Sequence, residues 1–466
     1  MGREDGVDKL IEESLQQDRF NYGILFEAGE TDRLVALMHG NPLNYHELAL
    51  DYAQAGLHAR ANAVLDLAIE AGAVNAMTYY YKTWLNVEVC PLPDTPMPIC
   101  FPNRLEDILA LQRVIDLDKK DAQAPYLLGC LFYDKRQYDE AIRLWEQSAE
   151  INPRFPTVWR NLALAAYNKQ NERQKAVAFM ERAFHLDESD SRILMELDQL
   201  YKVMQRPHSE RLSFLQQYPD LIAQRDDLVL EEITLLNQLG RYEEAMTKLD
   251  AHKFHPWEGG EGKVPAQYQI CRVELAKQAL MRKEAEKAIL LLQECLDYPH
   301  HLGEGKLYGA QENDFYYLMG LAYEQLGDKE KARESYTRAI EGPTEPAAAM
   351  YYNDAKPDKI FYAALAWRKL GDDTKANGLC YKLITFGEKH VFDEVRMDYF
   401  AVSLPDLLIW DGDLQQKNTI HCNLMMALGH LGLGHMEKGR CMLSEIMKLD
   451  INHPVPHAMQ TLVNFL

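Results

Sequence analysis

Long apolar runs are absent from this 466-residue sequence, and no segment approaches the roughly twenty consecutive apolar residues that a membrane-spanning helix needs. The first eight residues are rich in charge and no hydrophobic stretch follows them, so we expect no signal peptide. The sequence therefore predicts a cytoplasmic protein that does not associate with a membrane.

Cysteine and histidine motifs for metal or redox chemistry are also absent. The eight cysteines are scattered without a Cys-x-x-Cys pair, so we predict no metal site and no cofactor. Cys90 and Cys100 flank a proline-rich loop and could pair in an exported protein, but free thiols are the expectation here. His421, His430 and His435 are nine and five residues apart, which does not align them on one helical face.

Basic residues are outnumbered in this chain. The sequence has 50 Lys and Arg against 71 Asp and Glu, which gives a formal net charge of −21. Nucleic-acid binding needs a concentrated basic face, so the charge argues against that function. With 47% hydrophobic residues and 20 prolines, the composition also argues against disorder. The acidity fits either simple solubility or an acidic groove for a basic partner.

What the chain does contain is a series of small residues at a fixed step. Two helices can cross closely only where the facing residues are small, because those residues set the distance between the axes. A small residue in each helix, with a turn-prone stretch between them, predicts an antiparallel helical hairpin. Six pairs are twelve positions apart and the last is thirteen apart: Ala49/Ala61, Gly129/Ala141, Ala276/Ala288, Gly320/Ala332, Ala364/Ala376, Ala427/Gly439 and Ala163/Ala176.

At these positions the chain resembles the tetratricopeptide repeat, and the resemblance covers nearly all of it. Stacked hairpins of this kind predict an all-α, right-handed solenoid of about ten tetratricopeptide-like helical hairpins. We expect N-terminal capping helices over 1–42, and repeats one to five over 43–225 with a proline-rich loop at 90–102. Repeats six to ten, with glycine-rich loops between repeats, are expected over 226–466.

The spacing between repeats changes along the chain. The second-helix alanines Ala141 and Ala176 are 35 residues apart, but from Ala245 the steps to Ala288, Ala332 and Ala376 are 43, 44 and 44. The step inside these later hairpins stays at twelve, so the extra residues must lie between hairpins. Such insertions emerge from one edge of a solenoid, which is often where these proteins bind.

Two of the extra segments have related sequences. Gly-Glu-Gly-Lys occurs at 260–263 and again at 303–306, 43 residues later. Glycine lets the backbone approach a ligand closely, and a tryptophan nearby offers a flat face for stacking on a sugar or an aromatic ring. The alternative is that these segments only turn the chain and bond to each other. The candidate binding residues are His255, Trp257, Glu258, Glu261, Lys263, Glu304, Lys306, Glu312, Asn313 and Asp314.

The same part of the chain resembles a narrower family. The segments 255–262, 302–306, 312–314 and 398–405 are similar to the C-terminal repeat region of large proteins of unknown function. In those proteins a β-sandwich region similar to sugar mutarotases precedes the repeats, and the resemblance implies a link to carbohydrate metabolism. This chain opens on helices and has no counterpart of the sandwich region, so any activity of that region is not transferred.

The sequence therefore predicts a non-enzymatic scaffold that binds a protein, with a mutarotase-like β-sandwich domain as the first partner to consider. The alternative is a carbohydrate-binding or carbohydrate-processing accessory region that completes the active site of such a domain, with a glycan as ligand. Glu261 and Glu304 could form a glycosidase carboxylate pair, but we assign no catalytic residue. By repeat position, the residues expected to face the groove of the solenoid are Asp314, Tyr317 and Glu324 in repeat eight and Asp358, Phe361 and Arg368 in repeat nine.

Overall fold

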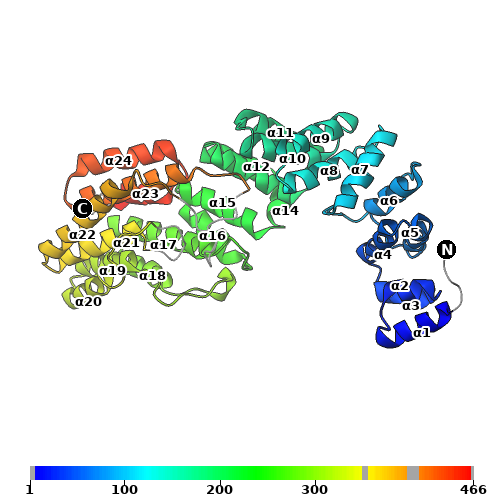
Figure 1. Ribbon diagram of the computed structural model, residues 1–466. Coiled ribbons are helices and arrows are strands. Elements are labelled where there is room, and N and C mark those ends of the chain that lie inside the picture. Colours follow the sequence, from blue (N-terminus) through cyan, green and yellow to red (C-terminus); the bar gives the residue numbers. More distant parts are fainter. Residues whose placement is uncertain (1–5, 349–354, 396–408, 463–466) are drawn as a thin grey trace. The chain divides into compact units, whose positions relative to one another are not determined.

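The computed structural model describes residues 6–348, 355–395 and 409–462, which form 25 α-helices, one 3₁₀ helix and no strand (Figure 1). Two compact units divide the chain, Met1–Leu186 and Asp187–Leu466. The predicted all-α class of stacked tetratricopeptide-like hairpins is confirmed, whereas the predicted division after residue 225 stays a prediction. The sequence motif at 398–405 lies outside the described residues.

The first unit consists of three short helices followed by four hairpins. The hairpins pair α4 with α5, α6 with α7, α8 with α9, and α10 with α11. The helices are α1 (Val7–Gln17), α2 (Tyr22–Glu27), α3 (Thr31–Met38), α4 (Pro42–Gln54), α5 (His58–Glu70), α6 (Ala76–Asn86), α7 (Leu105–Leu117), α8 (Gln123–Asp134), α9 (Tyr138–Ile151), α10 (Pro156–Asn168) and α11 (Arg173–Leu186).

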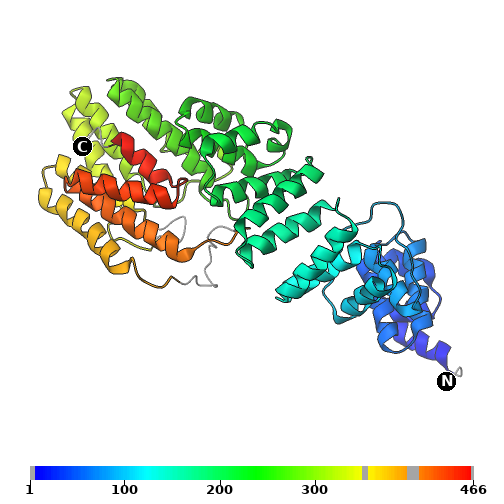
Figure 2. The ribbon, with the colours of Figure 1, turned by 90° about the horizontal axis from the view of Figure 1, so that it is seen from above.

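The second unit continues the same pattern with six hairpins and a final helix. Figure 2 shows α22, α23 and α24, coloured yellow to red, running side by side. The elements are α12 (Ser191–Val203), α13 (His208–Leu215), α14 (Pro219–Ile222), α15 (Asp226–Gln238), α16 (Tyr242–Ala251), α17 (Lys263–Met281), α18 (Ala285–Glu294), η1 (His300–Leu302), α19 (Asn313–Gln325), α20 (Lys329–Ala339), α21 (Pro357–Lys369), α22 (Asp373–His390), α23 (Leu414–Gly432), α24 (Met436–Leu449) and α25 (Pro454–Leu462).

The small residues of the repeats lie where the two helices of a hairpin cross. A Cβ atom added to Gly129 would lie 3.1 Å from the carbonyl oxygen of Ala141 and 2.6 Å from the indole of Trp145. A Cβ added to Gly320 would overlap the ring of Tyr336 in the same way. Each pair thus combines a close backbone crossing with a large side chain packed beside it, which is the arrangement that the twelve-residue step predicts.

Two of the later hairpins, α19/α20 and α21/α22, turn through the same Gly-Asp pair. Gly327 and Gly371 have φ of 76° and 89°, a left-handed conformation that glycine adopts without a Cβ clash. The aspartate after each glycine then caps the second helix, because Asp328 accepts from the Lys331 N–H and Asp372 accepts from the Lys375 N–H. The Gly-Asp pairs therefore end one helix and begin the next.

The proline-rich loop ends later than the sequence indicates. We expected the second helix of repeat two to start near Pro102, but α7 starts at Leu105. The reason is Asp107, whose carboxylate accepts from the backbone N–H groups of Asn103 at 2.7 Å and Arg104 at 3.0 Å, which fixes the first turn three residues further on.

Candidate interaction surface

The two glycine-rich segments of the second unit dock against each other. The Phe254 N–H donates to the His301 carbonyl at 2.8 Å, and the Gly262 N–H donates to Glu304 Oε2 at 2.8 Å. Gly303 has φ of 76°, and a Cβ atom there would lie 2.7 Å from the carbonyl oxygen of Phe254. We call the surface formed by residues 254–263 and 301–308 the glycine-rich rim.

Inside the first segment, the tryptophan packs on a glycine. The indole of Trp257 covers Gly260 so closely that no side chain could replace the glycine hydrogen, and the Gly260 N–H donates to the Trp257 carbonyl at 3.0 Å. Trp257 is half-buried as a result, whereas Glu258 and Glu261 on either side of Gly260 are exposed. The segment thus combines a half-buried aromatic side chain with two exposed carboxylates.

The start of the same segment is tied to α15 by an aspartate between two histidines. Asp226 Oδ1 lies 2.7 Å from His252 Nε2, and its Oδ2 accepts from the His255 backbone N–H at 2.7 Å. Burial raises the pKa of Asp226, but these hydrogen bonds outweigh burial and hold the pKa below its usual value. His255 is held at its backbone and also at its ring, because Nδ1 lies 3.0 Å from Asp226 Oδ2, although the side chain is 75% exposed.

The pKa of Glu304 is raised above the usual value of a glutamate, which favours the neutral form. Burial raises its pKa, the negative charge of Glu261 raises it further, and the Gly262 N–H opposes both. The charge of Glu261 thus contributes to the raised pKa of Glu304, while a glycosidase carboxylate pair of these two residues stays a prediction. One carboxylate oxygen of Glu304 accepts a hydrogen bond from a backbone amide. This oxygen therefore stabilises the contact between the two segments.

The predicted residues at the C-terminal end of the second segment bond to neighbouring parts of the chain, Lys306 at the surface and Asn313 in the interior. Lys306 donates to the Leu296 carbonyl at 2.8 Å and forms an ion pair with Glu312. Asn313 is 5% exposed, and its Nδ2 donates to the carbonyls of Ala339 at 2.9 Å and Glu341 at 2.8 Å. These three side chains bond α18, α19 and α20 to one another.

Asp314 is also interior. It is 8% exposed and forms an ion pair with Lys359 of α21. Burial raises the pKa of Asp314 more than the Lys359 ammonium lowers it. Tyr317 is 2% exposed and Phe361 is fully buried, so the expectation that these three residues face an open groove is wrong. Tyr317 instead packs against the rings of Tyr336 and Tyr362, at centroid distances of 5.8 and 5.7 Å.

The rim brings His255, Trp257, Glu258, Glu261 and Glu304 together at one edge. Lys263, the first residue of α17, is exposed beside them. Sequence reasoning missed two neighbours, Leu307 and Tyr308, which are 51% and fully exposed. The available signal was an apolar pair directly after the second Gly-Glu-Gly-Lys, in a segment that is otherwise polar.

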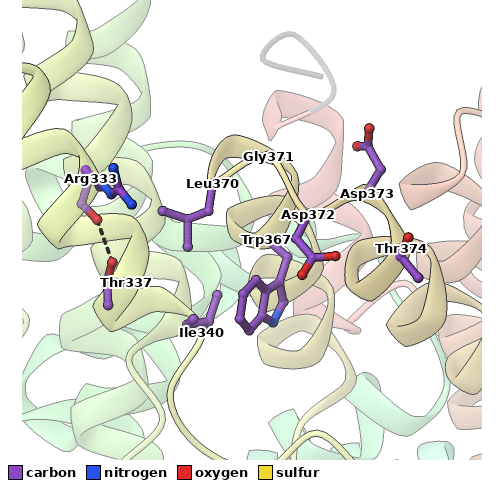
Figure 3. Close-up of a pocket in the computed structure, with 9 residues that line it drawn as sticks. All are labelled: Arg333, Thr337, Ile340, Trp367, Leu370, Gly371, Asp372, Asp373 and Thr374. Carbon is purple, nitrogen blue, oxygen red and sulfur yellow. Dashed lines mark hydrogen bonds between the residues drawn. The ribbon is translucent and has the colours of Figure 1, made fainter.

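A separate open hollow lies between α20 and the turn that joins α21 to α22 (Figure 3). Its volume is about 570 Å³, and Trp367 stands at its centre with the Lys375 ammonium 3.9 Å from the ring centroid. Thr337 on the opposite wall donates to the Arg333 carbonyl at 2.9 Å. The lining residues are those of an ordinary junction between two hairpins, and none of the predicted binding residues belongs to it.

Within the described part of the chain, no group of three or more His, Cys, Asp or Glu side chains could hold a metal ion. Among the same residues, no helix combines the length and the apolar character needed to cross a membrane.

Comparison with known proteins identifies repeats at two places. Family models described as tetratricopeptide repeat match residues 126–191 and 314–341. The first match spans the hairpins α8/α9 and α10/α11, and the second spans α19/α20. The chain therefore contains tetratricopeptide repeats, as the small-residue step and the turn signatures predict.

Solved structures of helical-repeat proteins are similar over larger parts of the chain. One is YrrB, described as a tetratricopeptide-repeat protein with an unusual peptide-binding site, at 15% identity and a TM-score of 0.28, covering 50% of this chain and 91% of that one. Another is Naa15/Naa10 bound to HypK, at 12% identity and a TM-score of 0.35, covering 75% of this chain and 61% of that one. A tetratricopeptide-repeat protein from Parabacteroides merdae matches at 13% identity and a TM-score of 0.26, with coverages of 70% and 98%. At these TM-scores the likeness carries no functional argument.

Proposed function

We propose that this protein is a non-enzymatic scaffold that binds a protein partner through the glycine-rich rim. The observation that carries the proposal is the docking of the two glycine-rich segments on each other through Phe254, Gly262 and Gly303. Docked loops present a surface of fixed shape, and a preorganised surface loses less conformational entropy on binding than separate mobile loops do.

The chemistry of the rim supports a protein ligand. Exposed Tyr308 and Leu307 supply apolar area, and half-buried Trp257 adds an aromatic face. Exposed carboxylates at Glu258 and Glu261 surround this area. Aromatic anchors ringed by polar groups are the usual composition of a protein interface.

The resemblance of this region to repeats that follow a mutarotase-like β-sandwich makes such a domain the first partner to test. The same resemblance and the pairing of aromatic faces with carboxylates also support the alternative, a glycan ligand or a contribution to the sandwich domain's active site. A protein partner and a glycan ligand can be distinguished with the isolated chain, because a glycan site needs no second protein.

The test is a binding titration of the full chain with a purified mutarotase-like β-sandwich domain and, separately, with oligosaccharides. We expect the domain to bind and the double substitution Glu261→Arg with Tyr308→Ala to weaken binding at least about tenfold. The matched control changes an exposed glutamate and an exposed tyrosine elsewhere in the same unit, Glu330→Arg with Tyr381→Ala. Equal loss in both double variants would move the site away from the rim, and oligosaccharide binding without the domain would favour the alternative.

A further inference from the structure

The last part of the chain that the structure describes lies against the beginning of the second unit. We call residues 450–462 the C-terminal segment; it contains the turn after α24 and the helix α25. Its partners come from α12, α13, α15 and α17, which precede it by 181 to 250 residues along the chain. We call the contacting residues the docking face: the side chains of Gln205, Arg211, Gln238 and Lys277 and the backbone carbonyl of Lys202.

The docking face contacts the backbone of the segment. Gln205 Oε1 accepts from the Ile451 N–H at 2.8 Å, and Gln238 Nε2 donates to the Asn452 carbonyl at 3.0 Å. Both contacts reach the main chain of the segment, and main-chain hydrogen bonds are one way in which proteins hold a peptide.

Asn452 is the polar anchor of the segment. Its Oδ1 accepts from Arg211 Nη1 at 3.3 Å, and its Nδ2 donates to the Lys202 carbonyl at 3.3 Å. Arg211 is fully buried and is held by ion pairs to Asp198 and Glu231, each at 2.6 Å. The guanidinium is therefore fixed in place by its own unit and presents its remaining N–H to the asparagine.

The helical half of the segment supplies an apolar anchor and a second backbone contact. Met459 is 2% exposed and Leu462 is fully buried in the core of the second unit. The Lys277 ammonium, which is also fully buried and paired with Glu274, donates to the Ala458 carbonyl at 2.8 Å. The docking face thus recognises both ends of a short peptide.

The fit between segment and docking face is incomplete. His208 of α13 and His457 of α25 have ring centroids 6.1 Å apart. The Nε2 atom of each ring is buried with no hydrogen-bond partner among the described residues. Buried polar atoms without a partner cost free energy, so the segment is held less tightly than its buried surface alone would give.

We propose that the docking face is a peptide-binding site whose resident ligand is the chain's own C-terminal segment. An external peptide with the same features, an asparagine two residues before a proline that starts a helix, binds there when the segment leaves. This site is separate from the glycine-rich rim, so the proposal does not depend on the proposed function. A resident ligand lowers the apparent affinity for an external one by the fraction of time that the site is free.

The test uses a fluorescent peptide of residues 450–462 and the full-length chain. A segment variant, Asn452→Ala with Met459→Asp, removes the polar and the apolar anchor without touching the docking face. We expect the peptide to bind this variant at least about tenfold more tightly than wild type, because the site is vacated. A peptide in which alanine replaces the asparagine should bind the variant at least about tenfold more weakly.

Lys448→Ala is the matched control, because Lys448 is exposed, lies just before the segment and forms an ion pair with Glu445 of its own helix. It should behave as wild type. If the segment variant does not fold, hydrogen exchange on wild type decides: excess unlabelled peptide should accelerate exchange of the Ile451 amide. No binding to the folded variant, equal binding to variant and wild type, or an Ile451 amide indifferent to the peptide would each overturn the proposal and make the segment a permanent part of the fold.

Discussion

The two Gly-Glu-Gly-Lys segments are identical in sequence and different in use. In the first, residues 260–263, the opening glycine lies under Trp257, the glutamate is exposed and the lysine begins α17. In the second, residues 303–306, the opening glycine touches the Phe254 backbone, the glutamate binds the Gly262 N–H and the lysine turns back to the Leu296 carbonyl. The second segment is hydrogen-bonded to the first, whereas the glutamate and lysine of the first segment are exposed to solvent.

The glycines show how neighbours decide these roles. Gly262 has φ of 73° and caps α17, so the third position of the first segment needs a left-handed backbone. Its counterpart Gly305 has no left-handed φ and no atom within 4 Å of an added Cβ. In the second segment the left-handed residue is Gly303 instead. An identical motif therefore does not imply an identical function at each of its positions.

The largest expected effect comes from Gly303→Ala. An alanine in a left-handed conformation costs about 1–2 kcal/mol, and its methyl group would also press on the Phe254 carbonyl, which is backbone and cannot rotate away. We expect the two segments to separate, which hydrogen exchange of the Phe254 amide would report as a loss of protection of at least about tenfold.

Gly305→Ala is the control for that variant, because the added methyl group meets nothing and the backbone is already compatible with alanine. Its effect on the same amide should stay within about 0.5 kcal/mol. If both variants lose protection equally, the second segment is merely sensitive to any change and the close contact at Gly303 has no special role.

A smaller effect should distinguish the two glutamates. Glu304→Ala removes the acceptor of the Gly262 N–H and should cost about 1 kcal/mol, which corresponds to roughly fivefold faster exchange of the Gly262 amide. Glu261→Ala removes an exposed carboxylate and keeps Glu304 as the acceptor of the Gly262 N–H, so that exchange should be unchanged or slightly slower. Similar acceleration by both would show that the two glutamates contribute alike.

The hairpins could be predicted from the sequence because their determinants are local. Gly129 and Ala141 lie twelve residues apart and meet in the same crossing, so a step along the chain translates directly into a contact. The same holds for the Gly327-Asp328 turn, whose two residues end one helix and cap the next. The same Gly-Asp pair recurs at Gly371-Asp372 in the next hairpin, so the pattern is reinforced by repetition.

The candidate site could be predicted only in part, because the fate of a polar side chain depends on what lies opposite it. Asn313 has the composition of a binding residue, yet two carbonyls at the end of α20 lack helical partners and take both of its N–H groups. The contact of Asn452 with Arg211 joins residues 241 apart and has no periodic signature. Tyr308, by contrast, could have been found, because apolar side chains in a glycine-rich loop have no hairpin to pack into.

The smallest expected effect concerns the acidity of Glu304. Burial and the Glu261 charge raise its pKa in the docked state, so docking is fully favourable below the ordinary pKa of a glutamate and weakens as pH rises through the raised value. Glu261→Gln removes one of the two causes and should lower the pKa of Glu304, which a carboxyl ¹³C titration measures. It should also slow exchange of the Gly262 amide slightly at neutral pH, since less free energy is lost on ionisation.

Glu258→Gln is the control, because Glu258 is exposed on the same segment but is not among the groups that shift the pKa of Glu304. An equal pKa shift with Glu258→Gln would mean that Glu304 responds to the general negative charge of the rim rather than to Glu261. The electrostatic interaction between the two Gly-Glu-Gly-Lys segments would then be weak.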